Sequence, residues 1–152
     1  MRLEHRIPPP LIFVVFALTA ILCARLLPGA SVSVPGQSVV AGLLLAVGIV
    51  VIAAALLQFK RARTTTNPLV PEAASALVDR GIFAHTRNPM YLGLSLGLAA
   101  LVVWLGNAAG LALVAGFIAY IGRFQIAPEE RALRAKFGET FDAYATRVRR
   151  WI

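Results

Sequence analysis

The sequence is poor in the residues that form catalytic centres in many soluble enzymes. Its 152 residues include only seven acidic residues, two histidines and one cysteine. Because Cys23 is the single cysteine, no disulfide can form within the chain, and no Cys/His cluster indicates a metal site. No Ser-His-Asp arrangement is evident, and there is no convincing strand from which a glycine-rich phosphate loop might follow. A Rossmann-type cofactor site is therefore not expected.

Long apolar runs dominate the chain instead. Hydrophobic residues make up 59% of it and the mean hydropathy is +0.76, a composition typical of integral membrane proteins. A spanning helix needs roughly 20 apolar residues, and the third apolar run, 90–121, is too long for one span. Its middle, "WLGNAAG", has the Gly and Asn of a tight turn. We predict an all-α integral membrane protein, a single domain with four spans at about 10–27, 38–59, 89–105 and 108–124.

The first apolar run has a second interpretation as a cleaved signal peptide. It follows a short charged start and precedes small residues at 29–31. The run is long for a signal core, so we favour a retained span. Three further spans make the protein integral in either case.

The basic residues are distributed unevenly, and their positions predict an orientation. Apart from Arg25, which lies near the end of the first span, they occur at the N-terminus, in the loop 60–87 and from the end of the fourth span onward, whereas the loops 28–37 and 106–110 contain none. This asymmetry predicts that both termini face the cytoplasm, with the protein in the cytoplasmic membrane. It also accounts for the net charge of +8 without a nucleic-acid partner, although anionic lipid headgroups would be attracted to the same side.

Two cytoplasmic segments contain further periodic patterns. In the loop, residues 71–78 predict a short helix that ends at Gly81. The tail, 128–152, predicts amphipathic helices interrupted at Gly138. Its apolar residues recur at steps of three and four, namely Leu133, Phe137, Phe141, Tyr144, Val148 and Trp151. Such a stripe either lies flat on the membrane or packs against the cytoplasmic ends of the spans.

Two motifs, one on each side of the third and fourth predicted spans, resemble a known family. "LVDRGIFAHTRNPMYLG" at 77–93 is followed by "EERALRAKFGETFDAYATRVRRW" at 129–151. Together they resemble the paired pattern of the isoprenylcysteine carboxyl methyltransferase and phospholipid methyltransferase superfamily, over half of the chain. The resemblance implies an integral membrane enzyme that binds S-adenosyl-L-methionine in a cytoplasmic pocket built from the last spans and the C-terminal helices. Its acceptor would be lipophilic or membrane-partitioned: an isoprenylcysteine-like carboxylate, a phospholipid amine or a thiol.

The resemblance assigns positions to the cofactor site. The expected cofactor contacts are Leu77, Val78, Phe83, Arg87, Asn88, Pro89, Met90, Tyr91 and Glu129. Arg87 is included because its guanidinium suits the cofactor carboxylate. The remaining candidates, assigned to catalysis, are Glu130, Arg150 and Arg123. Three positions depart from the family pattern: Asn88 replaces the usual His, Phe83 a Tyr, and Gln125 a frequent basic residue. Asparagine can donate and accept hydrogen bonds but cannot carry a proton, so we assign position 88 to binding.

The chemistry of methyl transfer suits such a sequence. Displacement at a sulfonium needs no metal and no covalent enzyme intermediate, so alignment in a water-poor site can supply much of the acceleration. We expect Glu129 to hold the ribose or the amino group of the cofactor. Arg87 and Tyr91 would also suit an interfacial anchor, and Glu129 and Glu130 a helix start, but the joint spacing favours the functional interpretation.

Two other functions remain open from the sequence. One is an NADPH-dependent membrane reductase of the sterol-reductase type, which usually needs more spans and a larger pocket. The other is a non-catalytic small helical membrane protein in which Asn88 marks a lost activity. Binding of S-adenosylhomocysteine, of NADPH or of neither would distinguish the three functions.

Overall fold

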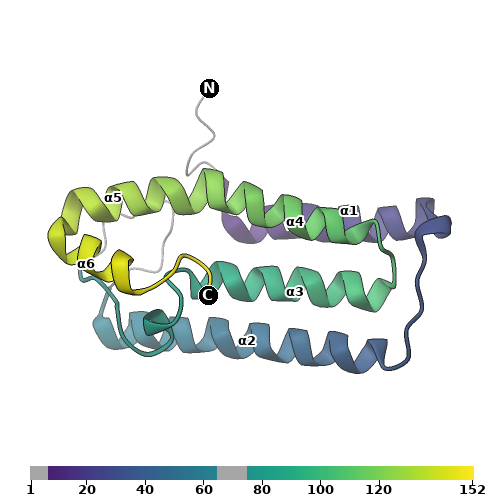
Figure 1. The fold of residues 1–152 in the computed structure, drawn as a ribbon, viewed down its shortest axis with the longest axis horizontal. Coiled ribbons are helices and arrows are strands. Elements are labelled where there is room, and N and C mark those ends of the chain that lie inside the picture. The colour runs from purple at the N-terminus through teal and green to yellow at the C-terminus, as the bar shows by residue number, and fades with distance from the viewer. Residues whose placement is uncertain (1–6, 65–74) are drawn as a thin grey trace.

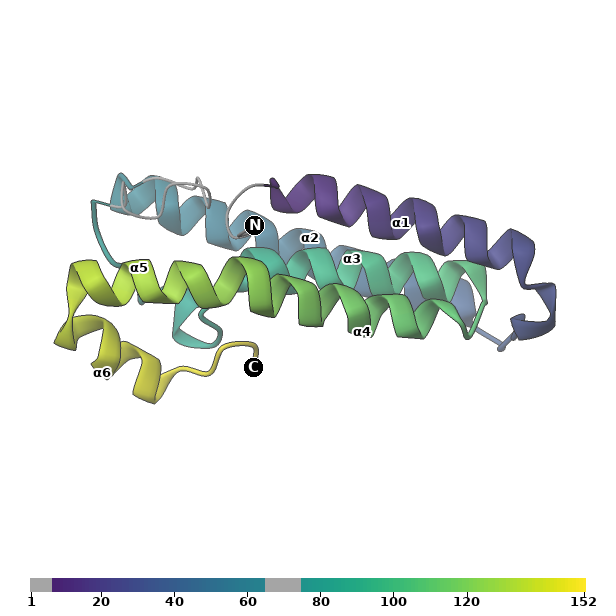
Figure 2. The same ribbon diagram turned by 90° about the horizontal axis from the view of Figure 1, so that it is seen from above.

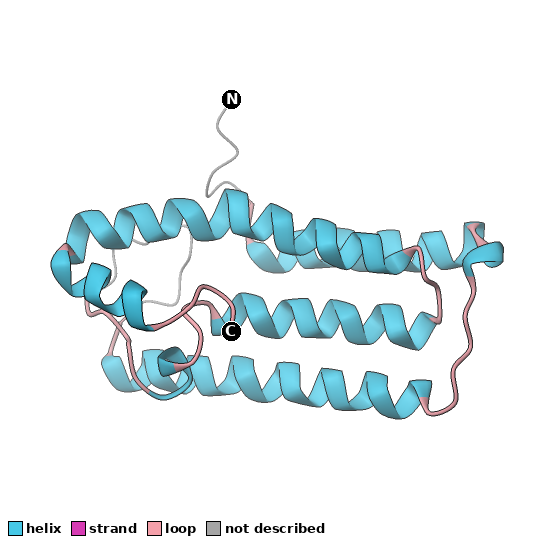
Figure 3. Ribbon diagram, in the orientation of Figure 1, coloured by secondary structure: helices cyan, strands magenta, loops and turns pink. Residues whose placement is uncertain are grey.

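The computed structural model describes residues 7–64 and 75–152, and within them the chain is helical (Figures 1 and 3). The described part contains no strand beyond one isolated bridge between Ser31 and Asn107. The all-α prediction is confirmed there. The principal helices are α1 (Pro9–Leu26), α2 (Gln37–Ala62), α3 (Pro89–Leu105), α4 (Gly110–Ile121), α5 (Ala127–Phe137) and α6 (Glu139–Arg147).

The long helices lie side by side, and α3 is in contact with α2, α1 and α4 (Figures 1 and 2). Large apolar side chains on α1 and α2, among them Leu18, Leu43 and Val50, are more than half exposed. Within residues 7–64 and 75–152, three helices are long and apolar enough to cross a membrane: Pro9–Leu26, Gln37–Ala62 and Gly110–Phe137. The apolar helix α3 has only 17 residues. The exposed apolar faces and these helices indicate a membrane environment, and a fourth crossing by α3 stays a prediction.

Glycines allow α2 and α3 to approach closely. A Cβ atom added at Gly93 would lie 2.7 Å from the carbonyl oxygen of Gly48, and one added at Gly48 would lie 2.9 Å from the carbonyl oxygen of Gly93. Neither distance leaves room for a side chain. The two backbones therefore pack directly against each other, as small residues permit in membrane helices.

The predicted turn between the third and fourth helices is present. Helix α3 ends at Leu105, and Gly106 adopts a left-handed conformation with φ of 59°, which favours glycine. The next residue, Asn107, accepts a hydrogen bond from the Ala109 amide and donates one from its side chain to the Leu27 carbonyl. The turn therefore both closes the α3–α4 hairpin and ties it to the end of α1.

The fourth helix continues farther than the sequence indicated. We expected a span at 108–124 and a separate tail helix from 128, but α4 continues through the π-helical turn Gly122–Ile126 directly into α5 (Figure 2). Pro128 has no amide hydrogen to donate in a helix interior, and the π turn just before it changes the hydrogen-bond pattern there. The 28 residues to Phe137 measure about 42 Å, longer than a hydrocarbon core of about 30 Å. Between Gly110 and Pro128 the only charged residue is Arg123, whereas five charged residues lie between Glu129 and Phe137. We therefore place α5 beyond the apolar part of the helix.

The C-terminal tail folds back onto the protein. The chain breaks at Gly138, as predicted, with φ of 51°, and α6 returns beside α5 (Figure 1). Phe141, Tyr144 and Val148 form a small buried core that Leu77 and Leu133 help to cover. Of the two expected roles for the apolar stripe, packing against the protein is the one observed.

The predicted helix at 71–78 is absent where it can be assessed. Residues 71–74 lie outside the described part, and 75–78 form bends and irregular coil. Gly81 does not end a helix but begins the short 3-10 helix Gly81–Ala84, with φ of 62°. In the segment before it, Leu77 instead packs against the tail core, the buried cluster of Phe141, Tyr144 and Val148.

Candidate functional site

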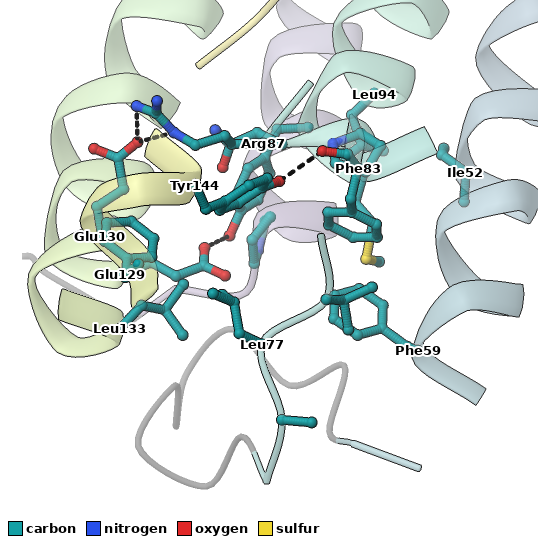
Figure 4. A pocket seen from close by; sticks show the side chains of 18 of the residues that line it. Ile52, Phe59, Leu77, Phe83, Arg87, Leu94, Glu129, Glu130, Leu133 and Tyr144 are labelled. Carbon is teal, nitrogen blue, oxygen red and sulfur yellow. Dashed lines mark hydrogen bonds and ion pairs between the residues drawn. The ribbon is translucent and has the colours of Figure 1, made fainter. Parts of the chain in front are cut away.

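A cavity of about 380 Å³ lies where the loop before α3 meets α5, α6 and the ends of α1 and α2 (Figure 4). Its walls therefore come from segments far apart in the sequence. Its lining residues are Pro9, Pro10, Ile52, Phe59, Ala76, Leu77, Val78, Phe83, Arg87, Asn88, Pro89, Met90, Tyr91, Leu94, Glu129, Glu130, Leu133, Phe141 and Tyr144.

The cavity brings together the residues assigned to the cofactor from the sequence. All nine of them line it: Leu77, Val78, Phe83, Arg87, Asn88, Pro89, Met90, Tyr91 and Glu129. Glu130, assigned to catalysis, lines it as well. These positions are contributed by the loop, the first turn of α3 and the first turn of α5, which places the two sequence motifs on facing walls of one cavity.

The cavity has a polar end and an apolar end. Figure 4 shows Glu129 and Glu130 on one side and Ile52 and Leu94 on the other. On the apolar side the Phe59 and Phe83 rings pack edge to face, with centroids 5.1 Å apart. A ligand with one polar and one lipophilic portion would therefore find a matching wall for each.

At the polar end, Tyr91 and Glu129 form a hydrogen-bonded pair. The Tyr91 hydroxyl donates to Oε2 of Glu129 across 3.0 Å. Burial raises the pKa of the Glu129 carboxyl to about 7; the hydrogen bond from Tyr91 opposes that rise, and the neighbouring Glu130 charge adds to it. Glu129 is thus a carboxyl group that gains or loses its charge near neutral pH.

The adjacent Glu130 is held by two arginines. Oε1 accepts from Nη2 of Arg87 at 2.8 Å, and Oε2 accepts from Nη2 of Arg150 at 2.6 Å. Burial disfavours its charged form, but the hydrogen bonds and charges of Arg150 and Arg87 outweigh this and hold the pKa of Glu130 below its ordinary value. The same pairing raises the pKa of Arg150. Glu130 therefore stays ionised and paired.

Arg87 also contacts the C-terminal segment, which the sequence did not predict. Its Nη1 donates to the carbonyl oxygens of Ala145 at 2.8 Å and Val148 at 2.6 Å. Its amide donates to the Arg149 carbonyl at 3.0 Å. Pairing of this kind depends on tertiary folding, and no spacing in the sequence signals it.

Asn88, which stands at the family's histidine position, is buried and faces the same segment. Its side-chain Nδ2 donates to the Arg150 carbonyl at 2.9 Å, and its amide donates to Thr86 Oγ1 at 3.2 Å. The side chain thus lines the cavity and anchors the C-terminal segment at once.

Two of the residues assigned to catalysis lie away from the cavity wall. Arg123 is exposed on the π turn and does not line the cavity. Arg150 does not line the cavity, but it contacts two residues that do: Glu130 through its guanidinium and Asn88 through its carbonyl oxygen. Arg123 lies two positions before Gln125, so the two side chains point to nearly opposite faces of the helix, and it is Gln125 that is buried.

Several lining residues were not singled out from the sequence as ligand contacts. Leu133, Phe141 and Tyr144 were recognised there only as an apolar stripe. Tyr144 donates from its hydroxyl to the Phe83 carbonyl at 2.8 Å, and burial raises the pKa of Tyr144, so the hydroxyl stays protonated. The walls from α1 and α2, Pro9, Pro10, Ile52 and Phe59, belong to apolar runs that carry no distinguishing signal.

Comparison with known proteins agrees with this geometry. The family model for phospholipid methyltransferases matches residues 37–140, more than half of the chain. The chain belongs to the phospholipid methyltransferase family. The match includes every lining residue on α2, α3 and α5, and α1 and most of α6 lie outside it.

One relative is similar to this member of the methyltransferase family over a short region. An uncharacterized protein of Haemophilus influenzae is 48% identical over 63 residues, which are 41% of this chain and the whole of that protein. No solved structure matches the chain. Family membership thus supports a membrane methyltransferase, and the cofactor and the acceptor are argued from the site below.

Proposed function

We propose that this protein transfers a methyl group from S-adenosyl-L-methionine to a lipophilic acceptor in the membrane. The observation that carries the proposal is the cavity itself, in which Glu129 and Tyr91 form a polar end that is continuous with an apolar end. A cofactor with a positively charged sulfonium and amino group suits the partly buried carboxylate of Glu129. A lipophilic acceptor suits the apolar walls.

The donor and acceptor groups at the polar end fit the proposed cofactor. Glu129 would accept hydrogen bonds from its ribose or amino group. The first turn of α3, where Pro89 has no amide donor and the next amides have no partner within the helix, suits its carboxylate. Leu77, Val78 and Phe83 would pack against its apolar surface.

The cofactor supplies an electrophilic methyl group at its sulfonium when bound, and the chain's own residues do the rest. The apolar walls, Phe59 and Phe83 among them, keep water away from the reacting atoms. Tyr91 fixes the orientation of the Glu129 carboxylate, so the charge that faces the cofactor is preorganised. Alignment and water exclusion are then the principal contributions of the protein.

The acceptor would enter from the lipid side. Pro9 and Pro10 at the start of α1, together with Ile52 and Phe59 on α2, line the apolar end, and both helices expose apolar faces. A carboxylate, an amine or a thiol on a lipophilic molecule would each present its nucleophile toward the polar end. We place this end on the cytoplasmic side, with four crossings and both termini in the cytoplasm, because the basic residues gather there.

The test is methyl incorporation by purified protein. Tritium from methyl-labelled S-adenosyl-L-methionine should appear in a membrane lipid extract added as acceptor. Glu129→Gln and Tyr91→Phe should each lower incorporation by roughly ten-fold or more, because a hydrogen bond to a charged group is worth about 1.5–3 kcal/mol. Tyr120→Phe is the matched control, since it removes the same hydroxyl outside the cavity. Incorporation that is unaffected by both site variants would remove this cavity from the reaction.

A further inference from the structure

The C-terminal strap, residues 148–152, crosses the start of α3 next to the proposed cofactor cavity. We propose that Arg87 is a positioning residue that fastens this strap to the cavity wall and that it does not bind the cofactor carboxylate. The inference rests on the proposed function for its ligand, but the contacts that carry it belong to the protein alone.

The guanidinium of Arg87 is almost fully used by the protein. A guanidinium has five N–H donors. Nε and Nη2 donate to Oε1 of Glu130 at 3.2 and 2.8 Å, and Nη1 donates to the carbonyls of Ala145 and Val148. The side chain is only 14% exposed. Binding a carboxylate side-on needs two parallel donors, and these four bonds leave only one.

Residues 86–88 also donate hydrogen bonds to the backbone carbonyl oxygens of the strap. The Arg87 amide donates to the Arg149 carbonyl, and Nδ2 of Asn88 donates to the Arg150 carbonyl. Thr86 Oγ1 donates to that carbonyl as well, at 3.4 Å. Three consecutive residues, 86–88, thus bind three consecutive strap carbonyls, 148–150. This arrangement fixes the strap along its length.

The strap is fastened a second time to the opposite wall of the cavity. The Arg150 guanidinium binds both oxygens of Glu130, and Glu130 also binds Arg87. Trp151 packs against the core cluster that contains Tyr91. The ion-pair network therefore links the start of α3, the first turn of α5 and the strap. It fixes the position of Glu129, the neighbour of Glu130, opposite Tyr91.

This assignment makes a distinct prediction about ligands. If Arg87 positions the walls, its loss disturbs the whole cavity and weakens every ligand that occupies it. If Arg87 binds the cofactor carboxylate, its loss weakens only ligands that have one. S-adenosylhomocysteine carries the amino-acid portion, and 5′-methylthioadenosine has the same thioether nucleoside without it.

The experiment compares the affinities of these two compounds for the parent, Arg87→Lys and Arg150→Gln by calorimetric titration. Lysine keeps the charge but cannot make the forked contacts. We expect Arg87→Lys to weaken both ligands by the same factor, about ten-fold, and Arg150→Gln, at a more exposed position, to weaken both by a smaller common factor. Loss of affinity for S-adenosylhomocysteine alone would overturn the proposal.

Backbone hydrogen exchange provides a readout that does not depend on any ligand. The Arg87 amide is protected by the Arg149 carbonyl, so a released strap should raise its exchange rate. For both Arg150→Gln and Arg87→Lys, we expect faster amide exchange in the peptide that covers position 87 and unchanged exchange in α2. If the parent binds neither compound, the proposed function fails and the exchange data still decide the role of the strap. Unchanged exchange in both variants would show that these arginines do not hold it.

Discussion

Glu129 is the residue whose charge matters most to the proposed site. With a pKa near 7 in the free protein, it is largely protonated at pH 6 and largely ionised at pH 8. A bound ligand that donates hydrogen bonds or carries positive charge favours the ionised form, so it must displace the proton at low pH. Affinity should therefore be highest above pH 7 and fall as pH drops through it.

The expected pH profile is measurable with S-adenosylhomocysteine. Its dissociation constant should rise by up to ten-fold per pH unit below about pH 7 and level off above it. The Glu129→Gln variant should bind more weakly and give a much flatter profile, since its amide does not titrate. A parent profile as flat as that of the variant between pH 5.5 and 8 would mean that Glu129 does not face the ligand.

From the sequence, residues that line the cavity could be named, but their partners within the protein could not. The resemblance of the two motifs to the family pattern assigned Asn88, Tyr91 and Glu129 to the cofactor, and all three line the cavity; their role in binding stays a prediction. The bonds from Arg87 to Ala145 and Val148 join segments about 60 positions apart. No local pattern encodes a contact of that kind, so the sequence alone assigned Arg87 to the cofactor and gave no sign of the four hydrogen bonds that its guanidinium makes within the protein.

Among the elements, the α2–α3 pair shows most clearly how packing positions the site. Gly93 and Gly48 allow backbone contact, and each lies within about one helical turn of a cavity residue, Tyr91 and Ile52 respectively. Substituting alanine at Gly93 would require the helices to separate, because the added carbon meets the Gly48 carbonyl oxygen. Overpacking of this kind costs about 1–3 kcal/mol.

We predict that Gly93→Ala lowers the thermal stability of the purified protein and weakens S-adenosylhomocysteine binding. Gly97→Ala is the matched control on the same helix, because a carbon there meets only Phe13 at ordinary contact distance. That control should keep or slightly raise stability, since alanine favours helix more than glycine. Equal melting temperatures for the two variants would refute the close-packing account.

The elements also show where sequence reasoning stops. The α3–α4 turn was predictable because Gly106 and Asn107 have conformations and hydrogen bonds that few other residues supply. Continuity of α4 with α5 was not, because Pro128 usually marks a helix start and nothing local signals a π turn before it. The expected helix at 71–78 failed at 75–78 because Leu77 packs into the tail core. There tertiary packing overrode local propensity.

For the whole molecule, the four-span prediction requires that α3 cross the membrane. Its 17 residues extend about 25 Å, short of a hydrocarbon core of about 30 Å. It nevertheless lies between α2 and α4 along the length of the bundle (Figure 1). Polar ends or local thinning of the bilayer would accommodate the difference.

Single cysteines placed in a Cys23→Ser background test this topology. Ser33, Ala84 and Ala143 are exposed and lie before α2, before α3 and on α6. We expect Ala84→Cys and Ala143→Cys to react with a membrane-impermeant reagent from the cytoplasmic side and Ser33→Cys from the other side. If Ala84→Cys and Ala143→Cys react from opposite sides, α3 and α4 do not both cross. The four-span model would then be wrong.

The most direct measurement for the account as a whole is a binding titration of the purified protein with S-adenosylhomocysteine in the presence and absence of NADPH. We predict saturable binding at one site per chain, weakened by Glu129→Gln and unaffected by NADPH. Tyr120→Phe should bind as the parent does, since that residue lies outside the cavity. Absence of S-adenosylhomocysteine binding, or its displacement by NADPH, would contradict the assignment of this cavity to a methyl-donor cofactor.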